Sequence, residues 1–123
     1  MKLTCKICNL DKPNRNGHIY KESCFADKVG GTYPVKFTSD DLRIDVVTPI
    51  GSATITNLDY PELTLDLDIF NKLAQKCLRN NIGGFGFSGM ASIKNNVIDE
   101  LKVSGLGYTD RCAVEQTIEI VEE

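Results

Sequence analysis

Residues 62–80 read ELTLDLDIFNKLAQKCLRN. In the first part of this segment apolar residues recur at every second position, and in the second part they recur every three or four positions. Leucines alternate with polar residues over the first six positions, as in a half-buried strand. Apolar residues then recur on one helical face from Ile69 to about Asn80. Asp68 is the expected N-cap, because its carboxylate can accept the free N–H groups of the first turn. The segment therefore predicts a strand followed by an amphipathic helix.

Strand-like alternation extends to both sides of this segment. Residues 42–47 and 53–56 are separated by a Pro and a Gly that can reverse the chain. After the helix come three further strand-like stretches with short turns between them: Phe85–Ile93, Val97–Tyr108 and Ala113–Val121. Short turns make antiparallel pairing the default. The sequence predicts an α+β fold of order β-β-β-α-β-β-β, with about six antiparallel strands and one helix on one face.

Four potential zinc ligands lie in the first 24 residues: Cys5, Cys8, His18 and Cys24. They include the only histidine of the chain, and thiolates with imidazole are common ligands of tetrahedral zinc. A Cys-x-x-Cys turn can present two thiolates to one ion, and so short a segment has few apolar residues for a core of its own. The pattern predicts a structural Zn²⁺ site with no open coordination position.

This segment resembles the treble-clef and knuckle-like zinc modules of small bacterial and viral proteins, in which a later His/Cys pair closes a Cys-x-x-Cys turn. The resemblance implies structural zinc and covers about a fifth of the chain. The second pair is more widely spaced than usual, so Cys77 or Cys112 is an alternative to His18 as a ligand. A redox dithiol and unconnected free thiols are the other interpretations, and an odd number of cysteines favours a reducing compartment.

A change of composition at Gly30-Gly31 predicts two units, a zinc-binding head (residues 1–30) and an α+β body (residues 33–123). Residues 1–36 hold seven Lys or Arg against three Asp or Glu, whereas the remaining residues hold seven against fourteen, and the net charge is −3. Nucleic acid would therefore meet only the basic head. The candidate phosphate contacts are Lys6, Lys12, Arg15 and Lys21.

The segment Gly84–Gly89 matches the G-x-G-x-x-G pattern of phosphate-binding loops. That mechanism requires a strand before the glycines and a helix after them, and here the expected order is reversed. The surroundings favour a structural role, in which the glycines permit close approach of another backbone or packing of a helix.

Acidic residues recur on single faces of the expected strands: Glu62, Asp66, Asp68, Glu115 and Glu119. If these strands are neighbours, they present a negative stripe that fits a basic protein surface. The alternative is a solvated face that keeps the chain soluble and protects strand edges. Open sheet edges also offer a route to homodimers.

No catalytic group of residues can be assembled, because the only histidine belongs to the zinc prediction. The favoured function is a non-enzymatic, zinc-stabilised binding protein, namely an acidic inhibitor or adaptor of a macromolecular partner. Nucleic-acid binding through the head and an enzyme of unknown type are the alternatives. No long apolar run and no hydrophobic leader is present, which predicts a soluble, cytoplasmic protein without membrane contact.

Overall fold

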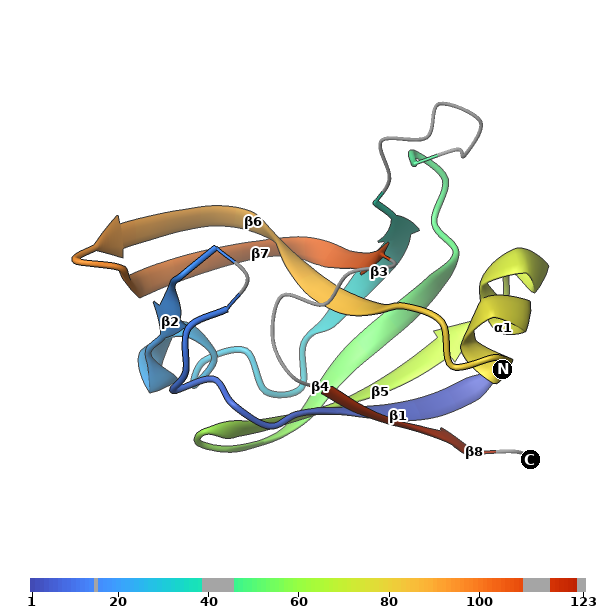
Figure 1. Cartoon of the computed structure of the whole chain (residues 1–123), viewed down its shortest axis with the longest axis horizontal. Coiled ribbons are helices and arrows are strands. Elements are labelled where there is room, and N and C mark those ends of the chain that lie inside the picture. The colour runs from blue at the N-terminus through green and yellow to red at the C-terminus, as the bar shows by residue number, and fades with distance from the viewer. Residues whose placement is uncertain (15, 39–45, 110–115, 122–123) are drawn as a thin grey trace.

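The computed structural model describes residues 1–14, 16–38, 46–109 and 116–121, and most of them lie in strands (Figure 1). The strands are β1 (Lys2–Ile7), β2 (Ile19–Tyr20), β3 (Thr32–Phe37), β4 (Gly51–Asp59), β5 (Glu62–Ile69), β6 (Gly84–Lys94), β7 (Val97–Thr109) and β8 (Gln116–Val121). One 3-10 helix, η1 (Glu22–Cys24), and one α-helix, α1 (Lys72–Arg79), complete the described elements.

All eight strands belong to one mixed sheet. The order along the sheet is β2-β7-β3-β4-β5-β1-β8, and β6 pairs with β7. Most neighbours are antiparallel, but β7 runs parallel to both β2 and β3. β7 has three partners because β2 pairs with its first residues and β3 with its last, while β6 follows most of its length. The two long strands β6 and β7 project as an arm (Figure 1).

The predicted fold class is wrong in strand number, in pairing and in the separate zinc module. β1 is a strand of the common sheet and lies between β5 and β8, with Cys5 opposite Leu65 on one side and Ile118 on the other. The physical reason is the alternation of residues 2–7, which buries Leu3, Cys5 and Ile7 and leaves Lys2 and Lys6 exposed. This period of two is that of a strand, and the Cys-x-x-Cys spacing obscures it.

The junction of β5 and α1 lies later than predicted. The alternation of β5 continues through Leu67 to Ile69, both of which are buried, so the strand includes two more residues. The N-cap is Asn71, whose Oδ1 accepts a hydrogen bond from the Ala74 N–H at 3.0 Å. Asp68, the predicted cap, is instead an exposed strand residue. The predicted strand over residues 42–47 falls almost entirely outside the described residues.

The core joins the inner face of the sheet to the segment around η1 and to α1. Phe25 is fully buried and packs against Tyr20 and Phe87, with ring centroids 5.5 and 4.8 Å apart. α1 contributes Ala74 and Leu78 to the same core. No helix in the described ranges combines the length and apolar character needed to cross a membrane.

The glycine-rich segment Gly84–Gly89 opens β6 and follows α1, so it has the strand context that the sequence predicts. The pairing of β6 with β7 shifts register between Ser88 and Gly89. A Cβ atom at Gly89, where φ is +157°, would lie 1.9 Å from the carbonyl oxygen of Lys102. Close approach of the β7 backbone therefore explains this glycine without any phosphate.

The position of β1 in the common sheet provides a test of the predicted division into a head (residues 1–30) and a body (residues 33–123). A chain of residues 33–123 is expected to show no cooperative thermal unfolding, because it lacks Leu3, Ile7 and Phe25. Burial of each such side chain contributes about 1.5–3 kcal/mol, and the whole free energy of unfolding of a domain is only about 5–15 kcal/mol. Circular dichroism on heating, with the full chain as control, measures this. A cooperative transition in the shortened chain would instead support an independent body.

Candidate functional site

The structure separates the four predicted zinc ligands. Cys5 is fully buried in the middle of β1, whereas Cys8 follows β1 and is half-buried. The Cys8 thiol donates to the Lys6 carbonyl oxygen at 3.8 Å. The Cys24 thiol is buried at the end of η1 and donates to the Ile98 carbonyl oxygen at 3.1 Å. His18 is half-buried, and its backbone N–H donates to the Asn14 side chain at 3.1 Å.

The conformation of β1 explains why Cys5 and Cys8 do not meet. In an extended strand, residues three apart point to opposite faces, whereas a zinc knuckle needs a tight turn between them. Within the described ranges, no three His, Cys, Asp or Glu side chains are gathered so that they could hold a metal ion. Of the alternative ligands, Cys77 is half-buried on α1 and Cys112 lies outside the described residues. Zinc binding by the chain stays a prediction, and the described residues contain no preformed site for it.

The environment of Cys24 is that of a core thiol and not of a reactive one. Burial raises the pKa of the Cys24 thiol, and the smaller opposing effects of the Lys21 backbone N–H and the Lys28 charge do not cancel it. Burial likewise raises the pKa of the Tyr20 hydroxyl. A nucleophilic cysteine needs the reverse, a lowered thiol pKa in an electropositive and accessible place. Cys24 is therefore a core residue whose thiol hydrogen bond ties η1 to β7.

The predicted acidic stripe is interrupted by β1. Asp66 and Asp68 lie on β5 and Glu119 on β8, all on the exposed face, but β1 runs between these strands. Thr4 is opposite both Asp66 and Glu119, and its hydroxyl donates to the Asp66 carboxylate at 3.3 Å. Lys2 is opposite Asp68. The face is therefore mixed in charge.

The two remaining carboxylates of the predicted stripe, Glu62 and Glu115, add no unpaired charge to the described face. The Glu62 carboxylate lies 3.6 Å from the Lys6 ammonium, so its charge is partly balanced within the sheet. Glu115 lies outside the described residues. A depression of about 400 Å³ on this face is lined mostly by polar or charged residues, including Thr4 and Asp66, which already bond to each other.

The predicted phosphate contacts do not form a cluster of free cations. Lys6 is paired with Glu62, and the Lys21 ammonium lies 3.1 Å from the Asp99 carboxylate. Lys12 is exposed in a turn before β2, and Arg15 lies outside the described residues. This arrangement gives nucleic-acid binding no specific support.

The free edge of β8 can be oriented from the hydrogen bonds of β1. Met1 and Ile69 exchange two backbone hydrogen bonds, with N···O distances of 2.7 and 2.8 Å. Bonded and non-bonded residues alternate along an antiparallel ladder, so the next residues directed toward β5 are Leu3, Cys5 and Ile7. The residues between them, Lys2, Thr4 and Lys6, direct their backbone groups toward β8, where their partners are Val121, Glu119 and Thr117.

It follows that Gln116, Ile118 and Ile120 direct their backbone groups away from β1. β8 is the last strand along the sheet, and no described residue bonds to the backbone N–H or C=O of Ile118 or Ile120. These groups form a short unpaired strand edge. Such an edge is a template for another strand.

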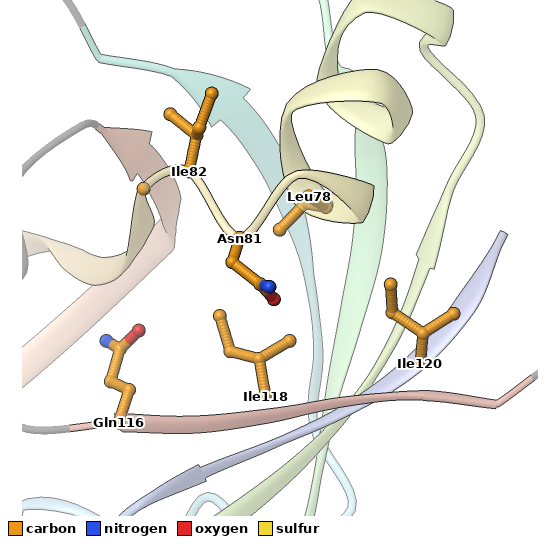
Figure 2. A pocket seen from close by; sticks show the side chains of 7 residues that line it. Leu78, Asn81, Ile82, Gln116, Ile118 and Ile120 are labelled. Carbon is orange, nitrogen blue, oxygen red and sulfur yellow. The ribbon is translucent and has the colours of Figure 1, made fainter.

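A cleft of about 350 Å³ lies between α1 and β8, and it is lined by aliphatic and amide side chains (Figure 2). Its lining combines residues from the end of α1 and the loop after it with the inward side chains of β8: Leu78, Asn81, Ile82, Gln116, Ile118 and Ile120. In Figure 2 the side chains of β8 point toward the helix. Ile118 and Ile120 thus contribute their side chains to the cleft and their backbone groups to the free edge.

The Gln116 side chain fixes one end of this cleft. Its Oε1 accepts a hydrogen bond from the Phe85 N–H at 2.9 Å, and its Nε2 donates to the Phe85 carbonyl oxygen. One amide side chain therefore makes both bonds that a neighbouring strand would make, and it joins β8 to the first residues of β6. After Gln116, the backbone groups of Ile118 and Ile120 form the free edge of β8 within the described residues.

The sequence indicates β8 as a strand but gives no sign of the cleft. Its lining comes from residues 78–83 and 116–120, which are distant along the chain. Alternation reveals which side chains share a face, but not which strand lies at the edge. A cleft built from two such segments becomes visible only with the strand order.

Replacement of two cysteines by serine distinguishes a core cysteine from a zinc ligand. We expect Cys5→Ser to lower the free energy of unfolding by about 1–3 kcal/mol, because it places a hydroxyl in the apolar core. Cys8→Ser should change it by less than about 0.5 kcal/mol. Urea unfolding measures both, and elemental analysis of the same preparations measures zinc. Equal destabilisation with loss of about one equivalent of zinc would contradict this expectation and support the zinc site.

The raised pKa of Cys24 predicts slow alkylation. With iodoacetamide near pH 8, Cys24 is expected to react at least about ten times more slowly than the half-buried Cys8, because the thiolate is the reactive form. Peptide mass mapping over time gives both rates. In concentrated urea the two should react alike, and equal rates in the folded chain would contradict the burial of Cys24.

Comparison with known proteins gives this chain no relative. No family model, no curated protein and no solved structure matches it. The function proposed for the chain therefore depends on its own residues, and above all on the edge and cleft of β8.

Proposed function

We propose that this chain is a non-enzymatic protein-binding module, an inhibitor or adaptor that holds an extended segment of a partner protein along the free edge of β8. The observation that carries this proposal is that the backbone groups of Ile118 and Ile120, to which no described residue bonds, lie beside the cleft under α1, where Leu78 and Ile82 offer aliphatic side chains. An added strand gains affinity from backbone hydrogen bonds and selectivity from pockets for alternate side chains. β8 and the cleft offer both.

Two other depressions give weaker support to a binding site. The one on the outer face is lined mostly by polar or charged residues, among which Thr4 and Asp66 bond to each other. A second, near η1, is lined largely by charged residues, and Lys28 there is paired with Asp27. Water solvates such groups well, so their burial by a partner returns little free energy.

The size of the site predicts modest affinity. A strand added along β8 meets only the few residues between Gln116 and Val121. The surface area that it buries is therefore far below the lower limit of a standard interface, about 1,200 Å². We therefore expect dissociation constants in about the micromolar range. Such affinity suits an adaptor that exchanges partners or an inhibitor that gains affinity from further contacts.

Selection from a random-peptide display library tests the proposal. Peptides with apolar residues at alternate positions should be enriched. Ile118→Pro should lower their affinity at least about tenfold, since proline removes an outward N–H but no β1–β8 hydrogen bond. The matched control Ile118→Val keeps the N–H and should bind within about threefold of the native chain.

The location of the bound peptide provides the second measurement. Amide chemical shifts should change in β8, in α1 and in residues 80–83, because these elements line the edge and the cleft. Peptides that bind the folded Ile118→Pro chain as tightly as the native one, or shift changes confined to other strands, would refute the proposal.

A further inference from the structure

We infer that the strand held at this edge is β8 of a second copy of the chain, paired antiparallel so that Ile118 lies opposite Ile118 of the second copy. This inference rests on the proposed function, because it names the partner of the same edge. The result is a dimer with twofold symmetry in which the two sheets become continuous.

The free edge of β8 is complementary to itself. Gln116, Ile118 and Ile120 each present one donor and one acceptor outward, so an antiparallel copy supplies a partner for every one of them. The twofold axis is then perpendicular to the joined sheet, and both inner faces lie on the same side. The two Ile118 side chains meet there, and Ile118 also lines the cleft under α1 of each copy (Figure 2).

The side chains of β8 select one register. A slip of one residue would exchange the inner and outer faces, so only registers two residues apart compete. With Ile118 opposite itself, Ile120 faces Gln116 of the second copy and Thr117 faces Glu119. The next register places Glu119 opposite Glu119 in a pair without hydrogen bonds, where side chains approach most closely. Like charges in such a pair are destabilising, which disfavours that register.

The register in the other direction also fails. It places Thr117 opposite itself and pairs only residues 116–118 of the strand, so the apolar Ile120 gains no partner from the described part of β8. With Ile118 at the centre, by contrast, residues 116–120 all pair. This register is therefore the longest one that keeps the two Glu119 carboxylates apart.

The charges on the outer face agree with this register. Lys6 lies opposite Thr117, and in the dimer Thr117 lies opposite Glu119 of the second copy. The Lys6 ammonium and that carboxylate therefore share one row across the joined sheet, with only Thr117 between them. The threonine hydroxyl can donate to the carboxylate, as the Thr4 hydroxyl does to Asp66 on the same face.

The dimer is expected to dissociate on dilution, because a five-residue strand pair buries less than the about 1,200 Å² typical of stable complexes. Sedimentation over an about hundred-fold range of concentration should show a reversible monomer–dimer equilibrium. Ile118→Val should preserve it. Ile118→Pro should stay monomeric throughout, since it removes the two central N–H donors of the symmetric pair.

Disulfide cross-linking tests the register and does not depend on the proline variant. Thr117→Cys and Glu119→Cys are made in separate chains, each with Cys8→Ser, because the Cys8 sulfur lies 3.9 Å from the Thr117 hydroxyl. Neither chain alone should gain a new intermolecular disulfide under mild oxidation. An equimolar mixture should gain one between positions 117 and 119, identified by peptide mass mapping.

A chain that stays monomeric at every concentration overturns the inference, as does a dimer that Ile118→Pro leaves intact. A 119–119 disulfide in the Glu119→Cys chain alone overturns the register. These failures are separable from failure of the proposed function. If the chain is monomeric but binds library peptides at β8, the edge takes a strand of a different protein. If it neither dimerises nor binds such peptides, both the dimer and the proposed function are wrong.

Discussion

The insertion of β1 between β5 and β8 is the interaction on which the rest of the sheet depends. Its inward side chains, Leu3, Cys5 and Ile7, are buried, and its backbone bonds to a strand on each side. Without β1, β8 would have no partner in the described sheet and β5 would become an edge. The N-terminal segment thus adds three buried side chains to the apolar layer, and its two lysines interrupt the acidic face.

Much of the local structure could be predicted from periodicity, whereas the assembly could not. The leucines of β5 and the apolar face of α1 identify these elements within a few residues. The spacing of Cys5 and Cys8 indicates a metal turn as readily as a strand, and only the burial of Leu3 and Ile7 decides between them. Alternation specifies a face, but it carries no information about neighbours.

The parallel pairing of β3 with β7 is a second example of strand neighbours that the sequence does not predict. Short turns favour antiparallel hairpins, as β4–β5 and β6–β7 confirm. Phe37 nevertheless lies opposite Tyr108, a residue far along the chain, and no local signal predicts that contact. Strand order also separates the acidic residues of β5 from those of β8, because β1 lies between the two strands. The candidate site is likewise an outcome of strand order, which makes the edge of β8 available beside α1.

The pairing of residues 2–7 with residues 116–121 has a consequence for the order of events in folding. The hairpins β4–β5 and β6–β7 close over short loops, whereas β1 and β8 come together across more than a hundred residues. Contacts of such high sequence separation form slowly, because the chain loses loop entropy before the contacts can stabilise the closed loop. On the ribosome, the second edge of β1 stays uncovered until residues 116–121 have been synthesised. The same strand that anchors the finished sheet is therefore the segment most exposed to mispairing while the protein is made.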